Sequence, residues 1–436
     1  MHVHGSFGEK VTYTARLSVR LADPVDPDLL GPALEKTQRR YPYLSLRIRR
    51  DGESYYYEEN PLPVVLLRRD GPVTLNAEET NHHVWAVCCS GEYLHLDMYH
   101  GATDGTGMYQ VLATLLYYYC ARRYGVTDRA GIRTLEDPVL PEETRDPQDE
   151  LPPPDPSRAP APPMAEAFTL ETDGGLTPSE PTIWDIELPE EALMRFTSAH
   201  DASPGTLISL LLARTIDGLY PRRDKEIVSV YVVNARPMLK AEQTFHNCLS
   251  MALFGYSDRI RAMPLTRQCT VYRGKTFVQS DEDRVREAMA ANAAYVRAAA
   301  RAAPGLEEKK RSFGQMFRGG EGLVTFLVSY TGKWRHPALG AYMREFWAHP
   351  PNTFSLMAEL SAAGGTVFLS LQQRFREDTV REAFLRQLEE NGIPYTVKRR
   401  MGSDVAAFPE PDSADSPPYA FRPGAGGDER TERKAP

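Results

Sequence analysis

A proline-rich stretch in the first half of the chain constrains its fold more than any other feature. Of the 29 residues from Glu136 to Met164, ten are proline, and most of the others are charged or small. Such a stretch stays extended and cannot bury a hydrophobic core. We therefore predict two folded parts, residues 1–135 and residues 168–400, joined by a crossover linker over residues 136–167.

The composition of the whole chain limits the classes of partner. The 436 residues are 42% hydrophobic and 25% charged, as in a soluble globular protein large enough for two domains. A net charge of −8 disfavours nucleic acid and anionic membranes as partners. No signal sequence and no apolar run long enough to span a bilayer is visible. Because the five cysteines lack metal-ligand spacing, they read as reduced thiols, and we expect a cytoplasmic protein.

The segment from Tyr93 to Gly107 combines a strand, a tight loop and the start of a helix. Alternation along the strand puts His100 at the end of an apolar row and puts His95 and Asp97 on the other face. Because metal ligands must converge on one point, we do not expect these side chains and Asp104 to bind a metal. A partly desolvated imidazole suits general base catalysis near neutral pH. The alternative for His100 is a core histidine with satisfied hydrogen bonds.

The sequence His100-Gly-Ala-Thr-Asp104-Gly105 resembles the His-x-x-x-Asp-Gly motif of the chloramphenicol acetyltransferase-like superfamily. That superfamily includes condensation domains of non-ribosomal peptide synthesis, plant-type acyltransferases and alcohol acetyltransferases. The resemblance implies that His100 is the catalytic residue. Condensation domains usually carry two adjacent histidines, and this chain has Tyr99 at the first position. We expect Tyr99 and Gly105 to line the active site.

A second segment supports the same resemblance. Asn234-Ala-Arg236-Pro237 follows a β-branched run that reads as a buried strand, and Phe245-His-Asn247 comes shortly after. The two are similar to the Arg-Pro and Asn positions in the second half of condensation-like proteins. The resemblance implies a structural ion pair between Asp104 and Arg236. The alternative is that Arg236 is a solvated charge at a strand end. Asn247 either lines the cleft or caps a turn.

A third segment, Val328-Ser329-Tyr330-Thr331-Gly332, is similar to a polar strand end in acyltransferase relatives. The similarity implies that Ser329 and Thr331 line the site and that one of them donates to an oxyanion. The Asp-Phe-Gly-Trp-Gly signature of the plant-type branch is absent. Residues 168–400 contain no second His-x-x-x-Asp, so we expect one site, at the interface between the two parts.

Hydrophobic periodicity and turn signals predict the remaining elements. Pro32 fits the first predicted helix only if it lies in the first turn. The tail over residues 401–436 is predicted to be disordered because it has almost no large aliphatic side chains. We expect strands over residues 11–21, 44–49, 53–58, 84–89, 93–99, 227–233, 322–330, 365–373 and 395–398, and helices over residues 29–40, 108–123, 190–200, 205–220, 282–303 and 379–391.

Together these features imply an α/β (α+β) protein with two chloramphenicol-acetyltransferase-like halves, each a mixed β-sheet with flanking helices, arranged as a pseudo-dimer. The resemblance implies acyl transfer from a thioester to an alcohol or amine, with His100 as the base. Acyl-CoA or acyl-phosphopantetheine would be the co-substrate, with no permanently bound cofactor, and we expect a monomer. A stand-alone condensation enzyme served by a separate carrier protein and an inactive binding homologue are the alternatives.

Overall fold

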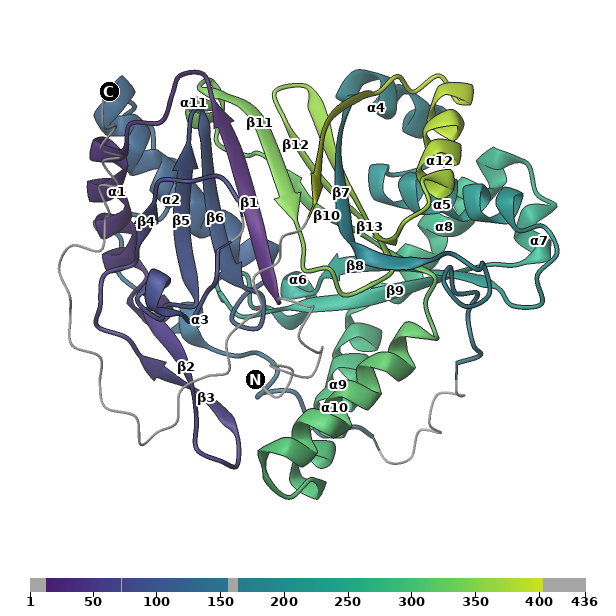
Figure 1. Ribbon diagram of the computed structural model, residues 1–436, viewed down its shortest axis with the longest axis horizontal. Helices are drawn as coiled ribbons and strands as arrows, with labels where there is room; N and C mark the ends of the chain where they lie inside the picture. Colours follow the sequence, from purple (N-terminus) through teal and green to yellow (C-terminus); the bar gives the residue numbers. More distant parts are fainter. Residues whose placement is uncertain (1–12, 72, 156–163, 403–436) are drawn as a thin grey trace, which may run out of the picture.

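The computed structural model describes residues 13–71, 73–155 and 164–402 (Figure 1). Its strands form two main sheets, of five and seven strands, and a separate two-stranded hairpin. Both main sheets are mixed, because β4 runs parallel to β5 in the first and β10 runs parallel to β8 and β12 in the second. This confirms the predicted α/β class with mixed sheets and flanking helices. Of the predicted disordered tail, residues 403–436 lie outside the described residues.

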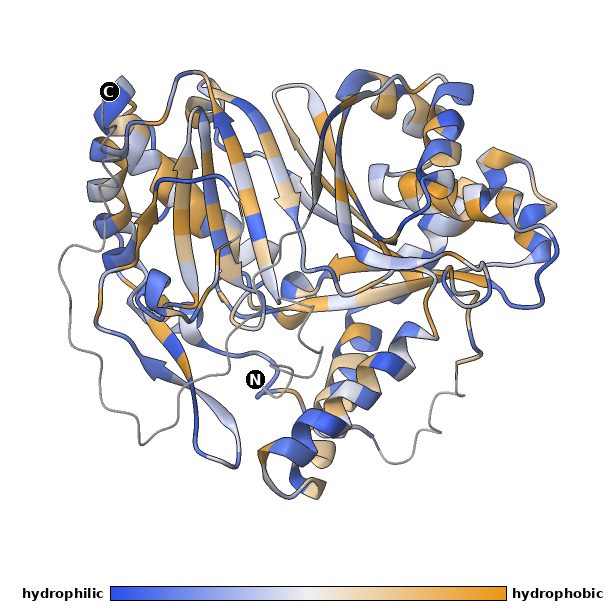
Figure 2. Ribbon diagram, in the orientation of Figure 1, coloured by the Kyte–Doolittle hydropathy of each residue, from blue (hydrophilic) through white to orange (hydrophobic). Residues whose placement is uncertain are grey.

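The first sheet has the order β11-β1-β6-β5-β4 and is covered by two long helices. Alternation along β1 sends Leu17, Val19 and Leu21 into the core, where they join apolar residues of both helices. Figure 2 shows this alternation as hydrophobic and hydrophilic bands along β1. The elements are β1 (Thr14–Leu21), α1 (Pro27–Arg40), β4 (Leu66–Leu67), β5 (Trp85–Ser90), β6 (Tyr93–Tyr99), α2 (Gly105–Tyr124) and β11 (Met343–His349).

The second sheet has the order β14-β7-β13-β12-β10-β8-β9. Helices α5 and α12 pack on each other, and α5 also packs on β8 and β10, so one face of this sheet is buried under helices. The elements are β7 (Pro178–Pro189), α4 (Glu190–Ala199), α5 (Pro204–Leu219), β8 (Ile227–Asn234), β9 (Leu249–Tyr256), α8 (Leu265–Gln279), β10 (Phe326–Lys333), β12 (Leu356–Ala363), β13 (Thr366–Phe375), α12 (Thr379–Glu390) and β14 (Thr396–Gly402).

Strand β11 links the two sheets. By sequence it belongs to the second part, yet it pairs antiparallel with β1, and Arg16 lies opposite His349. It also packs against β12 and β13, where the rings of Trp347 and Phe368 meet edge to face with centroids 4.8 Å apart. The division of the chain near residues 136–167 stays a prediction, but one strand from beyond it completes the first sheet.

Smaller elements surround this framework. The hairpin β2–β3 turns at Gly52, whose φ of +86° favours glycine. The hairpin turn contacts the start of α10, because the Leu306 amide donates to the Gly52 carbonyl at 3.1 Å. The remaining elements are η1 (Pro42–Leu44), β2 (Leu46–Arg50), β3 (Tyr55–Glu59), η2 (Glu78–Thr80), α3 (Pro141–Thr144), α6 (Arg236–Leu239), α7 (Asp258–Arg261), α9 (Glu282–Ala302), α10 (Gly305–Glu321) and α11 (Pro337–Gly340).

Two expectations about proline were wrong. Helix α1 begins at Pro27, so Pro32 lies in the second turn and not in the first. The carbonyl of Asp28, which loses an N–H partner there, belongs to an exposed residue and can bind water. The linker also contains folded structure, since α3 lies within it and Glu143 of α3 is buried. The proline-rich stretch therefore contributes one buried charged side chain, that of Glu143.

Sequence periodicity missed several elements that the structure contains. Strands β7, β9, β11 and β12 and helices α8 and α10 had not been predicted. Strand β12 is buried along its whole length, and its Ala and Ser residues give no alternation between polar and apolar positions. These strands depend on pairing with distant neighbours, which short-range patterns do not reveal.

Candidate active site

His100 lies directly after β6, beside a cavity of about 550 Å³ between the two sheets. The turn is fixed by the His100 amide, which donates to the Tyr13 carbonyl at 2.7 Å. The first part of the chain contributes β1, the loop after β6 and the start of α2 to the cavity wall. The second part contributes β8, β9, β10, β11 and β12. The motif histidine therefore opens onto a space that both parts enclose.

The surroundings of His100 favour a neutral imidazole. Burial lowers its pKa below the usual 6.5, while a hydrogen bond to the residue's own backbone and the charge of Asp104 act in the opposite direction. Asn247 approaches from the second part, with its Nδ2 atom 3.3 Å from His100 Nδ1 and 3.4 Å from the His100 carbonyl oxygen. A neutral ring with one nitrogen held by the protein leaves the other able to accept a proton.

Asp104 and Arg236 form a buried bidentate ion pair that joins the two parts. Arg236 Nη1 lies 2.8 Å from Asp104 Oδ2, and Arg236 Nη2 lies 2.9 Å from Asp104 Oδ1. The arginine is 2% exposed and the aspartate 0%. Arg236 also donates to the carbonyls of Thr244 and His246. The planar guanidinium thus holds the motif carboxylate and the 244–246 loop together.

Asp104 has a second structural role, because it is also the N-cap residue of helix α2. Its Oδ1 accepts from the Thr106 and Gly107 amides at 3.1 Å, and its Oδ2 accepts from the Cys248 amide at 2.8 Å. The first turn of α2 approaches the second part so closely that a Cβ at Gly107 would lie 2.8 Å from the Phe245 carbonyl oxygen. Glycine is needed there for close packing, and the motif loop has little freedom to move.

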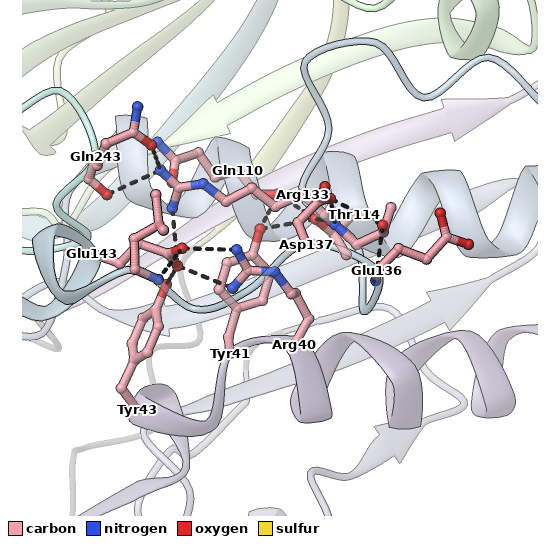
Figure 3. A network of polar contacts seen from close by, with 12 residues as sticks. Arg40, Tyr41, Tyr43, Gln110, Thr114, Arg133, Glu136, Asp137, Glu143 and Gln243 are labelled. Atoms are coloured by element: carbon pink, nitrogen blue, oxygen red, sulfur yellow. Dashed lines mark hydrogen bonds and ion pairs between the residues drawn. The ribbon is translucent and has the colours of Figure 1, made fainter.

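A second buried ion pair supports the 243–247 loop from the other side (Figure 3). Glu143 of α3 accepts from Arg40 of α1 at 2.8 and 3.0 Å and from the Tyr43 hydroxyl at 2.6 Å. Figure 3 shows Arg133 reaching from the same cluster to Gln243, whose side-chain oxygen lies 2.6 Å from Arg133 Nη2. The linker contacts this loop directly, because the Phe245 amide donates to the Glu143 carbonyl at 3.0 Å and the Gln148 side chain donates to the Asn247 carbonyl at 3.1 Å.

The structure distributes the other predicted site residues differently. Gly105, Ser329 and Thr331 line the cavity. Tyr99 does not; its ring is fully buried in the core of the first part, which corrects the expectation that it lines the site. The reason is strand alternation, which turns Tyr99 away from the face that carries His100.

Sequence reasoning missed Glu359, which lines the same cavity as His100. This residue of β12 is 4% exposed, and its Oε1 accepts from the Thr331 hydroxyl at 2.6 Å and the Thr331 amide at 3.1 Å. Burial raises the pKa of Glu359 to about 7, against hydrogen bonds from Thr331 and Ser329. The Thr331 hydroxyl proton is thus engaged by Glu359, which argues against Thr331 as the oxyanion donor of the two candidates Ser329 and Thr331. A lone charge within the apolar run Leu356–Ala363 was the available signal.

A third polar group on the wall is His349, at the end of β11. Its Nε2 lies 3.0 Å from Oδ1 of the buried Asp185 on β7. Arg399 lies 2.5 Å from the other oxygen of this carboxylate. Both partners lower the pKa of Asp185 against the effect of burial. The His349 imidazole on this wall is therefore bound to a paired and ionised carboxylate.

Metal-binding and membrane-spanning features were searched over the described residues. In residues 13–71, 73–155 and 164–402 no group of three or more His, Cys, Asp or Glu side chains is arranged to hold a metal ion. His95 instead contacts Ser18, and Asp97 pairs with Arg16. Within the same ranges no helix is long and apolar enough to cross a bilayer.

Comparison with known proteins identifies the class of fold. No family model matches the sequence, and no curated protein matches it. Solved structures, in contrast, match almost the whole chain. Together they show that this chain has the same overall fold as these solved structures, which include a condensation domain, and this is the fold that the resemblance in the sequence implied.

Three of these structures illustrate the range of proteins that share the fold. TRI101 of F. sporotrichioides, complexed with coenzyme A and T-2, is 15% identical, with 90% of this chain and 97% of that chain covered and a TM-score of 0.56. Polyketide synthase associated protein 5 of Mycobacterium tuberculosis is 12% identical, with 89% and 95% covered and a TM-score of 0.55. The first condensation domain of the calcium-dependent antibiotic synthetase, in complex with a substrate analogue, is 15% identical, with 88% and 94% covered and a TM-score of 0.57.

Proposed function

We propose that this protein is an acyltransferase that moves an acyl group from a thioester, acyl-CoA, to a hydroxyl or amine acceptor. The observation that carries the proposal is the position of His100, a histidine with a lowered pKa at a cavity enclosed by both parts of the chain. Two structures of the same fold contain coenzyme A, in complex with T-2 or as ethyl coenzyme A. The proposal needs no permanently bound cofactor.

In the proposed reaction His100 acts first as a base and then as an acid. We assign the Nδ1 proton to the hydrogen bond with the backbone, which leaves Nε2 to accept the acceptor's proton. The deprotonated oxygen or nitrogen attacks the thioester carbonyl and forms a tetrahedral oxyanion. As the C–S bond breaks, the imidazolium returns its proton to the leaving thiolate. General base catalysis of this kind contributes roughly 10²–10⁴-fold to the rate.

Other residues hold the base in place. The ion pair of Asp104 with Arg236 fixes the motif loop, and the Asn247 side-chain amide donates to the His100 carbonyl oxygen at 3.4 Å. Gly105 leaves the cavity wall beside α2 free of a side chain. Positioning of the two substrates supplies a further part of the rate acceleration.

A carrier-bound donor is the second candidate, favoured by the similarity to a condensation domain over 88% of the chain. In that case the donor would be an acyl-phosphopantetheine on a separate carrier protein. A catalytically inactive binding homologue is the third, and any turnover that depends on His100 excludes it. A monomer fits all three candidates, because one chain contributes both walls of the cavity.

The test is release of free thiol from a panel of acyl-CoAs with mixed alcohol and amine acceptors, comparing wild type with His100→Ala. Thiol release that requires both an acceptor and His100 supports acyl transfer from CoA. If the folded protein releases no thiol from any acyl-CoA, the CoA proposal is wrong. The same assay with acylated carrier proteins then decides between the second and third candidates.

A further inference from the structure

Six carboxylate side chains are buried in the part of the chain that the structure describes, and one of them differs from the rest. Five have an arginine nitrogen within 2.5 to 3.0 Å. Glu359 has no lysine, arginine or histidine within ion-pair distance among the described residues, although it is 4% exposed. The five paired carboxylates are Asp97 with Arg16, Asp104 with Arg236, Glu143 with Arg40, Asp185 with Arg399 and Glu345 with Arg20.

This exception lies at the cavity. Glu359 is on β12, between β10 and β13, and it lines the space onto which His100 opens. Its oxygen Oε1 is held by the Thr331 amide and hydroxyl. A carboxylate fixed by neutral donors in a partly apolar cavity retains most of the desolvation cost of its charge. A cationic group brought into the cavity would remove that cost.

The chain's own cations at the cavity do not supply the missing charge. Arg16 is bound to Asp97 at 2.8 Å, and Lys333 is bound to Glu190 at 2.6 Å. Arg335 is exposed. The remaining wall has a substantial apolar part, formed by Leu17, Met108, Val232, Leu249 and Trp334. An occupant that matches this wall has a hydrocarbon body and one positive charge.

We propose that Glu359 is the binding site for a basic nitrogen of the acceptor, so that the acceptor class is an apolar amine that carries a separate hydroxyl or amino group for acylation. The inference rests on the proposed acyl transfer. The ammonium binds to the carboxylate of Glu359 and stays protonated, while the group to be acylated reaches His100. Ser329 and Thr331 are positioning residues for this carboxylate.

The experiment uses alcohols that differ only by a nitrogen in place of a CH group. The probes are dimethylaminoethanol against isoamyl alcohol, and dimethylaminobutanol against the isosteric methylhexanol. Binding to the full-length protein is measured by calorimetry, and acyl transfer by thiol release. The quantity compared is the preference for the amine over the alcohol in which CH replaces nitrogen. It is measured for wild type, Glu359→Gln and Glu321→Gln. Glu321 is an exposed control that removes the same charge outside the cavity.

We expect wild type and Glu321→Gln to bind at least one amine roughly 10- to 100-fold more tightly than the matching alcohol that lacks nitrogen, and Glu359→Gln to lose that preference. Glu359→Asp, which keeps the charge on a shorter side chain, should retain part of it and serves if Glu359→Gln does not fold. The inference is overturned if no amine is preferred, or if the preference survives in Glu359→Gln.

The two proposals fail in different ways. Acyl transfer to the alcohols that lack nitrogen, without any preference for the amines, would support the proposed acyltransferase activity and overturn the proposed role of Glu359. Amine binding that depends on Glu359 without any thiol release would keep the subsite and overturn transfer from CoA.

Discussion

Replacing Asp104 by Asn tests whether the buried ion pair holds the site together. The substitution keeps the shape of the side chain but leaves the Arg236 guanidinium, 2% exposed, without its counter-charge. It also places an amide NH₂ opposite donors, because both Asp104 oxygens accept hydrogen bonds from Arg236 and from backbone amides. Removing one partner of a buried pair costs about 3–5 kcal/mol. We expect a loss of that size in urea unfolding at constant m-value, with reduced acyl transfer.

A double-mutant cycle separates the pair from the helix cap. Arg236→Met alone leaves Asp104 buried and charged, whereas Asp104→Asn with Arg236→Met removes both charges. The double variant should therefore lose clearly less stability than the sum of the two single losses, by roughly 2 kcal/mol or more. Glu191→Gln, which breaks the exposed pair with Arg195, should change stability little. A loss below about 1 kcal/mol for Asp104→Asn, or simple additivity, would refute the reasoning.

Three further predictions follow from other contacts. Burial lowers the pKa of His100, so kcat/KM for an uncharged alcohol acceptor should stay level from pH 8 to the usual histidine pKa of 6.5 and fall at lower pH as the imidazole is protonated, which a pH–rate profile measures. Glu143→Gln should destabilise the fold by about 3–5 kcal/mol in urea, because the charge of Arg40 is then unpaired. Glu359→Gln should raise the free energy of unfolding by about 3 kcal/mol well above pH 7 and change it little below pH 4.5, which urea unfolding in the two pH ranges measures.

The sign of the last effect follows from the direction of the pKa shift. Burial raises the pKa of Glu359 from 4.5 to about 7 in the folded state. The folded protein therefore holds the proton more tightly than the unfolded chain does. Below pH 4.5 both states are protonated and the carboxyl group adds no penalty. The penalty grows between pH 4.5 and 7 and is complete above pH 7. Equal effects of Glu359→Gln at pH 5 and pH 8 would show that the carboxyl group is not desolvated.

Short-range sequence patterns reveal the part of the site whose residues are close together in the sequence. His100, Asp104 and Gly105 follow one another through a strand end, a loop and a helix start, and short-range rules describe such units well. The partnership of Asp104 with Arg236 was predicted from a family resemblance. Composition and spacing alone left open the alternative that Arg236 is a solvated charge at a strand end. The periodic sequence of the helices likewise gave most of their positions, with errors of a few residues at the ends.

The rest of the site depends on pairings across the chain. Glu359 reaches the cavity only because β12 lies beside β10, and His349 only because β11 pairs with β1. Neither pairing has a signature in the local sequence, since both strands are buried and lack alternation. For Tyr99 the sequence led to the opposite error, because a residue that does not line the cavity was predicted to line it. Its neighbour in the motif faces the cavity, but alternation turns Tyr99 into the core of the first part.

The contacts that position His100, the proposed base, are also contacts that join the two parts of the chain. Arg236 and Asn247 come from the second part and bind Asp104 and His100 of the first. Strand β11 adds a backbone connection at the opposite wall of the same cavity. A shift of one part against the other would therefore move the base, its supporting ion pair and the wall that carries Glu359 together. Under the proposed function catalysis depends on the assembled interface, because the histidine comes from one part while Arg236 and Asn247 come from the other.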